Sequence, residues 1–500
     1  MKQRARHLKI RGTLGTLGLA LALAGCGSTV TLGSSGASSG TGLDSLGQPI
    51  TAPDTLASVP TAIAGISTPD QQAAGANDTS AGSQDSATTD PNYVAPASVV
   101  AAPLELGLFE SRNQSALAAS FGVSSGGITV EKVQDALVAW YNSHGGIAGH
   151  KIATVKAPID ATAASYETAY QAACASFTQD HHVVAVLDDY QYISAAFEEC
   201  STKAKLTHIR ASGSFLDQRS AATHPQLFTI GGVSVDRRLS LLIDKLTATG
   251  YLTKRNKIAV LVSGCSYNDA GYAHALVPAL KRHGLSITQK EEGKCTTGTS
   301  NAGPAAANAA HSVLAFKAAG IDRVMFVTDQ EDVGFLLFSE AAESQGYRPG
   351  YMLTSLSTPA LLTGTIPAQQ LKTVQGVGWA PASDVTTGKQ PSAGPSAKQC
   401  VSMLSKQGLK AASPADTSIM YSVCSAFFVL ERGALGTSPL TGAAIGRAVE
   451  ALGSAVSAPA VLLADTNFSP TRHDGPASTA VFAYATSCTC FSYITQPTRD

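Results

Sequence analysis

Short apolar runs alternate with longer amphipathic stretches from residue 103 onward. In Val130–Asn142, the apolar residues Val133, Leu137 and Trp140 recur at spacings of four and three, which predicts a helix with one buried face. Runs such as Val183–Leu187 are short and uniformly apolar, which predicts strands covered on both sides. The regular alternation favours an α/β fold built on parallel sheets. About 400 residues exceed one comfortable core, so two lobes are expected.

The same pattern gives each predicted element a range. The predicted strands are Leu104–Phe109, Lys151–Ala157, Val183–Leu187, Leu206–Arg210, Leu227–Gly231, Lys257–Ser263, Ser286–Lys290, Asp322–Thr328 and Gly350–Ser355. The predicted helices are Val130–Asn142, Ala163–Thr178, Tyr192–Lys203, Arg237–Leu246, Ala270–His283, Ala305–Ala319 and Asp332–Ser344. Because loops at the carboxyl ends of parallel strands form the binding crevice of open α/β sheets, we expect ligand-binding residues in these loops.

The first 25 residues have the pattern of a signal peptide. Five basic residues among the first eleven precede the uncharged apolar run Gly12–Ala24. That run is too short to span about 30 Å of hydrocarbon. The sequence Leu23-Ala24-Gly25-Cys26 resembles a bacterial lipobox, which implies that Cys26 becomes the mature N-terminus and carries acyl chains that anchor it stably. The alternative is an ordinary secretory signal with a chance cysteine.

Residues 26–102 are predicted to form a disordered linker behind that anchor. From Gly27 to Ala102 there is no Lys, Arg or Glu, and the single aromatic residue is Tyr93. Such a Gly/Ser/Thr/Ala/Pro-rich stretch cannot bury enough apolar surface to offset its ordering entropy. As a random coil it spans on the order of 50 Å. The formal net charge of the whole chain is −1, without a basic tract after the signal, so nucleic acid is not an expected partner.

Nine cysteines occur, and eight remain after Cys26 is set aside. An even number in an exported chain indicates disulfides, but eight cysteines allow 105 pairings, so spacing alone does not decide among them. Metal binding is the weaker hypothesis, because Cys488 and Cys490 have one residue between them and no histidine close in sequence. We therefore predict no metal and no cofactor.

The segment Ala139–Lys151 carries the most specific motif of the chain. It reads Ala-Trp-Tyr-Asn-Ser-His-Gly-Gly-Ile-Ala-Gly-His-Lys and is followed by the predicted strand Ile152–Ala157 and by Asp160. It resembles the helix end Asn-x-x-Gly-Gly-Ile-x-Gly, then strand, then Asp, of extracytoplasmic solute-binding proteins of the branched-chain amino acid (Leu/Ile/Val) type. Physically, the glycines can take positive φ, end the helix and turn the chain into the next strand.

Three later segments extend this resemblance over most of residues 103–500: Tyr267–Gly271, Tyr421–Leu430 and Phe468–Tyr493. It implies an α/β fold of two doubly wound parallel-sheet lobes joined by three crossovers, like type I periplasmic binding proteins. Lobe 1 is expected at 103–232 and 381–464, and lobe 2 at 233–380 and 465–500. The expected crossovers lie near Gly231–Asp236, Gly378–Ser383 and Ala464–Phe468.

The resemblance also implies a function. It predicts a monomeric, lipid-anchored protein on the extracytoplasmic face of the cell membrane. Its two lobes would close on a small polar solute (an amino acid, an amide or a related molecule) and deliver it to an ABC transporter permease. A sensing lipoprotein of the same fold, signalling to a membrane partner, is an alternative. An enzyme is not expected, because no His-Glu-x-x-His motif or phosphate-binding loop occurs; a surface hydrolase is the rival class.

The implied fold also pairs the remaining cysteines. It places consecutive cysteines on consecutive helices or after consecutive strands, and it therefore implies sequential pairing. The expected disulfides are Cys174–Cys200, Cys265–Cys295, Cys400–Cys424 and Cys488–Cys490.

In that family, a serine and small residues of one lobe bind the ligand carboxylate, and a tyrosine and an acid of the other lobe hold its ammonium. The candidate ligand-binding residues here are Ser111, Arg112, Asp189, Tyr190, Gln191, Ser194, Arg210, Ala211, Ser212, Tyr267, Asp329 and Ser355. No catalytic residue is predicted.

The sequence departs from the family at the third strand, which ends in Asp188-Asp189-Tyr190 where Gly and Ser are usual. Two carboxylates would repel an α-amino acid unless Arg112 or Arg210 offsets them, so a cationic or polyhydroxylated solute fits at least as well. Two structural alternatives stay open. The two aspartates could cap the following helix, and Arg210 could pair with a nearby acid.

Overall fold

The computed structural model describes residues 100–500. The residues left out within this range are Ser124, Gln191, Ile193, Ser212, 214–216, Gln218 and Asp329. The chain divides into two compact units, and every described residue belongs to the second, Gln84–Asp500. The predicted signal peptide, Cys26 and most of the predicted linker lie outside the described residues.

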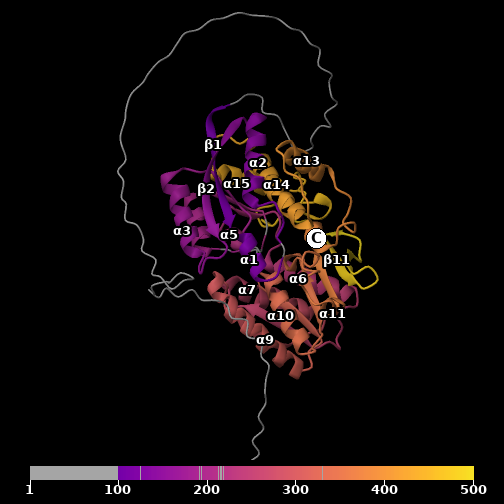
Figure 1. Cartoon of the computed structure of the whole chain (residues 1–500). Helices are drawn as coiled ribbons and strands as arrows, with labels where there is room; N and C mark the ends of the chain where they lie inside the picture. Colours follow the sequence, from indigo (N-terminus) through magenta and orange to yellow (C-terminus); the bar gives the residue numbers. More distant parts are fainter. Residues whose placement is uncertain are drawn as a thin grey trace, which may run out of the picture. The chain divides into compact units, whose positions relative to one another are not determined.

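A five-stranded parallel sheet and the helices that cover it form what we call lobe 1 (Figure 1). Its strands, in spatial order, are β2 (His150–Asp160), β1 (Val100–Arg112), β3 (Ala185–Asp188), β4 (Thr207–Arg210) and β5 (Leu227–Thr229). Its helices are α1 (Gln114–Ser120), α2 (Val130–Ser143), α3 (Glu167–Ala175), α4 (Ala195–Ala204), α5 (Ser220–Thr223), α13 (Pro395–Lys406), α14 (Pro414–Ala434) and α15 (Gly442–Glu450). Lobe 1 therefore combines an N-terminal sheet with helices from much later in the chain.

An eight-stranded sheet and its helices form lobe 2. Its strands are β12 (Cys490–Tyr493), β11 (Ser478–Ala485), β10 (Val374–Gly378), β9 (Gly350–Thr354), β8 (Arg323–Val327), β6 (Ile258–Ser263) and β7 (Ile287–Gly293), with β13 (Thr498–Arg499) on β11. Its helices are α6 (Val235–Ala248), α7 (Ser266–Gly271), α8 (Val277–Arg282), α9 (Ala302–Ala318), α10 (Glu331–Ser344) and α11 (Ala368–Leu371).

Strands β6 to β10 are parallel, but β11 runs antiparallel to β10 and to β12. The second sheet is therefore mixed rather than wholly parallel as expected. After β10 the chain builds α13–α15 of lobe 1 and returns as the hairpin β11–β12, whose strands are antiparallel, and β11 joins the edge of β10 in the opposite direction.

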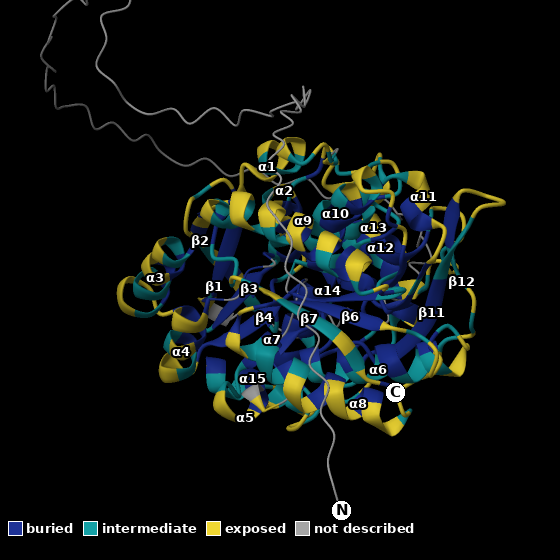
Figure 2. Cartoon of the chain, turned by 90° about the horizontal axis from the view of Figure 1, so that it is seen from below, coloured by how far each residue is buried: buried dark blue, intermediate teal, exposed yellow. Residues whose placement is uncertain are grey.

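Helices cover both faces of each sheet. In lobe 1, α2 and α14 bury one face around Leu106, and α3 and α4 bury the other around Phe109. In lobe 2, α9 and α10 cover one face, and α6 and α8 cover the other. Figure 2 shows the strands as a dark blue interior between helices whose outer surfaces are exposed. The predicted α/β class is thus confirmed. Among the described helices, none has both the length and the apolar character needed to cross a membrane.

The Gly-Gly motif forms the predicted turn between α2 and β2. Gly145 and Gly146 have φ of 97° and 82°, and a Cβ on Gly146 would lie 1.9 Å from the carbonyl oxygen of His150. The Asn142 side chain closes the turn, because it accepts from the amide of Ile152 (2.7 Å) and donates to its carbonyl (3.0 Å). Both observations explain why this turn requires asparagine and glycine.

Trp379 joins the three segments that connect the lobes. These are the stretch between β5 and α6, the stretch from β10 to α12 (Pro381–Asp384), and the stretch around residues 462–477. The buried indole Nε1 donates to the carbonyl of Gly231 (2.8 Å), and the Trp379 carbonyl accepts from the amide of Leu462 (2.7 Å). The connections are therefore held together at one point.

Four disulfides join the remaining cysteines in sequential pairs, as the resemblance implied. The pairs are Cys174–Cys200, Cys265–Cys295, Cys400–Cys424 and Cys488–Cys490. The first links α3 to α4, and the third links α13 to α14.

Candidate functional site

A cleft of about 640 Å³ lies between the two lobes. Lobe 1 contributes the carboxyl end of β1, the segment from α1 to the start of α2, the residues after β3 and the first two turns of α14. Lobe 2 contributes the start of α10 and residues 355–362 after β9. Gly231 and Ala380, from the connecting segments, also line it. The volume is within the usual range of ligand sites, roughly 300–1,000 Å³.

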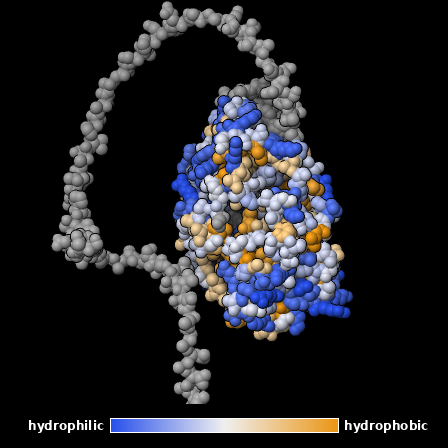
Figure 3. All heavy atoms as spheres, turned by 45° about the vertical axis from the view of Figure 1, so that its right-hand side comes forward, coloured by the Kyte–Doolittle hydropathy of each residue, from blue (hydrophilic) through white to orange (hydrophobic). Residues whose placement is uncertain are grey.

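The cleft walls are largely apolar. The apolar and aromatic lining residues include Leu117, Phe121, Val123, Ile128, Tyr190, Leu336, Leu356, Leu361, Leu362, Ile419 and Tyr421. Serine and threonine hydroxyls are interspersed, at positions such as Ser115, Thr358 and Ser418. On the face drawn in Figure 3, the most hydrophilic residues gather mainly towards the ends, and hydrophobic ones are scattered across the middle. The cleft can therefore hold the apolar body of a ligand and offer it hydroxyl partners.

A buried ion cluster lies below the lobe 1 wall, at the end of β3. Asp188 is 1% exposed; its Oδ2 lies 3.1 Å from Nη1 of Arg210 and 3.6 Å from Nε2 of His208. Nδ1 of His208 lies 3.1 Å from Glu198. The next residue, Asp189, lines the cleft. Asp188 thus holds the fold, and Asp189 faces the ligand space.

Neither aspartate caps the helix that follows. Ser194 is the N-cap of α4, where its Oγ accepts from the amide of Phe197 (3.1 Å). The capping alternative is therefore wrong. The other alternative is confirmed: Arg210 is 1% exposed and donates to the nearby acid Asp188.

Lobe 2 repeats this arrangement at the start of α10. Glu331 is 1% exposed and lies 3.1 Å from Nη1 of the equally buried Arg238. Glu331 also accepts from the hydroxyls of Thr354 (2.6 Å) and Ser357 (2.8 Å). The next residue, Asp332, lines the cleft. Each lobe therefore has an acidic dipeptide whose first member is buried against arginine and whose second member faces the cleft.

Four predicted site residues lie together in the cleft: Ser111, Asp189, Tyr190 and Ser355. Ser111 accepts from the amide side chain of Gln114. Ser355 Oγ accepts from the amide of Trp379 (2.8 Å). This bond joins the cleft wall to the connecting segments around Trp379, which we call the hinge.

Five other predicted residues lie outside the lining. Arg112 has a 61% exposed side chain, 3.2 Å from Glu110. Ser194 is buried and donates to Glu167 (2.7 Å). Arg210 and Ala211 are buried, and Tyr267 is half-buried on α7. Gln191, Ser212 and Asp329 lie outside the described residues.

Much of the cleft wall was not predicted from the sequence. The residues from Leu117 to Val130, Pro414–Ile419 of α14 and Leu361–Leu362 belong to no motif and follow no predicted strand directly. Asp332 lies in the loop after the predicted strand Asp322–Thr328, where ligand-binding residues were expected, and its likeness to Asp189 could have identified it: both are the second acid of a dipeptide after a strand.

The ionisable groups with displaced pKa values near the cleft include Tyr190 in its lining and Asp384 in a connecting segment. Burial, together with a hydrogen bond involving Tyr166, raises the pKa of Tyr190 above its usual 10, so its hydroxyl stays neutral. Burial raises the pKa of Asp384 in α12 from 3.8 to about 7, against hydrogen bonds from Tyr493, Ser355 and the amide of Ala380. The hinge therefore contains a carboxyl group that titrates near neutral pH.

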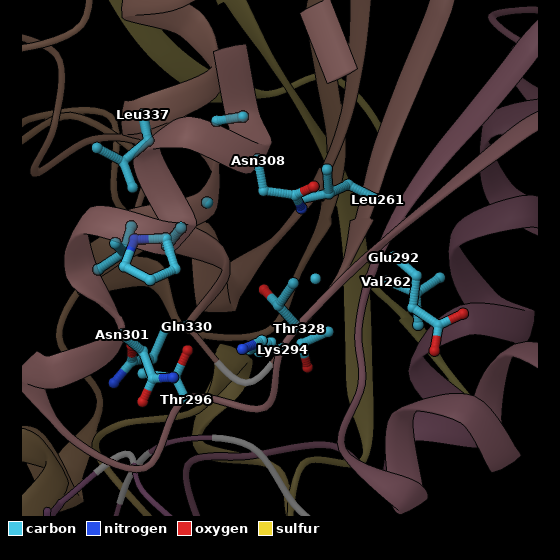
Figure 4. Close-up of a pocket in the computed structure, with 17 residues that line it drawn as sticks. Leu261, Val262, Glu292, Lys294, Thr296, Asn301, Asn308, Thr328, Gln330 and Leu337 are labelled. Atoms are coloured by element: carbon cyan, nitrogen blue, oxygen red, sulfur yellow. The ribbon is translucent and has the colours of Figure 1, made fainter. Parts of the chain in front are cut away.

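A smaller pocket of about 290 Å³ adjoins the cleft in lobe 2 and shares Gln330 and Val333 with it. Figure 4 shows Asn301, Thr296, Gln330 and Lys294 on one side of it and Leu337 and Asn308 on the other, with Glu292 set apart. The described residues contain no group of three or more His, Cys, Asp or Glu side chains that could hold a metal ion.

No protein-family model matches the sequence, and no curated protein matches it. Solved structures do. An ABC transporter solute-binding protein from R. palustris, in complex with 4-hydroxybenzoate, has 14% identity and a TM-score of 0.56; the match covers 80% of this chain and 97% of that chain. A possible leucine/isoleucine/valine-binding protein from Rhodopirellula baltica has 14% identity and a TM-score of 0.56; the match covers 79% of this chain and 97% of that chain.

A third structure is an ABC transporter substrate-binding protein from Desulfitobacterium hafniense in complex with Leu. It has 15% identity and a TM-score of 0.53, over 78% of this chain and all of that chain. At such identities a likeness shows the fold, while function depends on the site. The described part of this chain has the fold of ABC transporter solute-binding proteins of the leucine/isoleucine/valine-binding type, the type I periplasmic binding fold.

Proposed function

We propose that this chain is a lipid-anchored, extracytoplasmic solute-binding protein that delivers its solute to the permease of an ABC transporter. The observation that carries the proposal is the cleft of about 640 Å³, lined by both lobes and by the segments that connect them. Such a site closes when solute contacts on both walls stabilise the arrangement in which the lobes approach each other. Lobe 1 is then 103–232 and 381–464, and lobe 2 is 233–380 and 465–500.

The proposed location rests on the sequence before the folded part. Cys26 stands at the position at which a lipobox is cut, and residues 26–102 have the composition of a flexible tether. A tether of that length leaves the folded part free to approach a permease in the same membrane. Replacing Cys26 by Ser should move the protein from the membrane fraction to the soluble exported fraction. Retention of the Cys26→Ser chain in the membrane would contradict the anchor.

Solute binding is tested by a thermal-shift screen of the full chain with amino acids, amides, amines, sugars and aromatic acids. A ligand at 100 times its dissociation constant should raise the free energy of unfolding by about 2.7 kcal/mol. Ser418→Trp, which fills the cleft from α14, should abolish the shift. Lys398→Trp on the exposed surface of α13 is the matched control and should keep it. A chain that binds no solute but hydrolyses esters or peptides would overturn the proposal.

A further inference from the structure

The charges around the cleft indicate which ligands it accepts. Asp189 and Asp332 are its charged lining residues among those described, and no Lys, Arg or His is among the described residues of the lining. The nearby arginines are committed elsewhere: Arg210 to Asp188 and Arg238 to Glu331, both pairs fully buried. A carboxylate ligand would therefore meet two negative charges and no described cation on the lining.

The remaining wall favours a ligand with a sizeable apolar part. Apolar side chains come from both lobes, including Leu117 and Phe121 from lobe 1 and Leu336 and Leu361 from lobe 2. Burying apolar surface contributes about 25 cal/mol per Å², so this wall can supply most of the affinity for such a ligand. Hydroxyl groups of the lining can bond to neutral polar groups without selecting for charge.

We propose that the ligand is a cationic amphiphile, a molecule with a protonated amine and an apolar or aromatic body. This inference rests on the proposed function and narrows its solute class. The apolar body packs against both walls, and the carboxylates of Asp189 and Asp332 attract the amine and repel anions. Such a pair of carboxylates gives specificity in two ways, because it lowers the affinity for carboxylate ligands and raises the affinity for amines.

The test compares three molecules with one aromatic body: tyramine, 4-hydroxyphenylacetate and 4-hydroxyphenylethanol. Isothermal titration with the full chain should give an affinity for the amine at least tenfold higher than for the carboxylate, with the neutral alcohol between them. Asp189→Asn and Asp332→Asn should each lower the affinity for the amine about tenfold, which is the usual scale for a hydrogen bond to a charged group. The affinity for the alcohol should not change. Asp244→Asn, on the outer surface of α6, is the control.

The outcomes separate this inference from the function on which it rests. Tighter binding of the carboxylate, or binding of free amino acids but none of the three molecules, would overturn the ligand class and keep the solute-binding function. Absence of binding for every class of solute would overturn both. An amine preference that survives both asparagine substitutions would overturn the roles of Asp189 and Asp332.

An independent observation concerns a second contact between the lobes. Residues 162–166 of lobe 1, after β2, pair with residues 297–300 of lobe 2, between β7 and α9. The amide of Tyr166 donates to the carbonyl of Thr297 (2.8 Å), and the amide of Thr299 donates to the carbonyl of Ala163 (2.9 Å). The hydroxyl of Ser300 donates to the carbonyl of Ala164 (2.8 Å). These loops are far from the Trp379 hinge in sequence and join the lobes through backbone atoms and through the hydroxyls of Thr299 and Ser300.

The contact depends on a glycine. A Cβ on Gly298 would lie 2.2 Å from the carbonyl oxygen of Ala164, so any larger residue would separate the two loops. The lobe 2 loop is fixed at its start by the disulfide between Cys265 and Cys295. We infer that this contact is a latch that stabilises the arrangement in which the lobes touch, because it adds interlobe hydrogen bonds that no solute has to supply.

Gly298→Ala tests the latch without changing the cleft. Spin labels at Lys203 in lobe 1 and Lys281 in lobe 2 should report longer and broader interlobe distances in the variant. Tyramine should bind the variant about tenfold more weakly than it binds the unmodified chain, since fewer molecules occupy the competent arrangement. Gly303→Ala is the matched control, because nothing lies within 4 Å of a Cβ there. Identical distances in Gly298→Ala and the unmodified chain would overturn the latch.

Discussion

Each lobe buries the first acid of its dipeptide below the cleft, but the two buried sites differ in how they neutralise that acid. In lobe 1, Asp188 lies in a cluster with Arg210, His208 and Glu198, four ionisable groups in contact. In lobe 2, Glu331 pairs with Arg238 and takes its other hydrogen bonds from hydroxyls. The comparison teaches that one arginine suffices to bury an acid beside the cleft. Only the lobe 1 cluster adds a histidine, whose pKa the two acids raise above 6.5.

The largest expected effect comes from removing the arginines. Arg210→Met leaves Asp188 buried without its arginine and with His208 as its one remaining basic partner among the described residues, which costs about 3–5 kcal/mol of unfolding free energy. Arg238→Met should cost less, because Arg210 also donates to the carbonyls of Tyr190 (2.6 Å) and Tyr192 (3.1 Å) and so holds the loop after β3. Urea unfolding monitored by circular dichroism measures both values.

Lys203→Met is the control for these two variants. Lys203 pairs with Glu199 at 3.1 Å on the exposed surface of α4, and exposed pairs contribute at most about 1 kcal/mol. If Arg238→Met lowers the free energy of unfolding as much as Arg210→Met does, the hydrogen bonds from Arg210 to backbone carbonyls add no stability. The two lobes would then differ only in the titration of His208.

Another buried carboxylate, Asp384, sharpens the comparison because none of its described partners is a cation. Burial raises its pKa from 3.8 to about 7, so the folded state keeps a proton that the unfolded state loses near pH 4. The free energy of unfolding should therefore fall as the pH rises from about 4 to about 7, by at most about 4 kcal/mol. Asp384→Asn should remove that part of the pH dependence and be the more stable protein at pH 8.

Chemical unfolding of both proteins between pH 4 and pH 8 measures this difference. Parallel curves for Asp384→Asn and the unmodified chain would show that the carboxyl group titrates normally in the fold. Asp160→Asn serves as a control, because hydrogen bonds from Thr162 and Asn113 lower the pKa of that carboxyl group, so its pH dependence has the opposite sign.

The elements themselves could largely be predicted from the sequence. The helix expected at Val130–Asn142 is α2 at Val130–Ser143, because burial of one face imposes the helical period on the residues. The antiparallel edge of lobe 2 could not be predicted, since it depends on which sheet edge the returning chain joins after building α13–α15. Periodicity carries no information about that choice.

From the sequence, the only cleft residues that could be predicted were those at the end of a predicted strand or just after it. Asp189, Tyr190 and Ser355 follow strands directly and line the cleft. Phe121 and Ile419 reach it through tertiary packing of the α1–α2 segment and of α14, which no local pattern records. The sequence left open whether Arg210 pairs with a nearby acid or contacts the ligand. It does not show whether an arginine at the end of a strand points into the fold, as Arg210 does towards Asp188, or towards the ligand.

A smaller effect is expected from His208, which distinguishes the two clusters. Burial lowers its pKa, but the charges of Glu198 and Asp188 outweigh burial, so the pKa is raised above 6.5. Its stabilising contribution is therefore fully present below pH 6.5 and is lost as the pH rises through the raised pKa. His208→Gln should cost about 1–2 kcal/mol at pH 6 and less at high pH.

Arg238→Met provides the contrast for that measurement, because the described partners of Glu331 include no histidine. Its cost should be the same at pH 6 and at pH 9. A cost of His208→Gln that does not change with pH would mean that the imidazole acts as a neutral hydrogen-bonding group, and lobe 1 would then be no more pH-sensitive than lobe 2.

The smallest effects are expected for the second acids of the two dipeptides. Asp189→Asn should change the free energy of unfolding by no more than about 0.5 kcal/mol, because the side chain is only partly buried. Asp332→Asn should cost slightly more, since its carboxylate accepts from the amide of Val333 (2.9 Å) in the first turn of α10, where a negative charge is favourable. If instead either variant unfolds as readily as Arg210→Met, that aspartate holds the fold, and the division of each dipeptide into one structural and one ligand-facing acid is wrong.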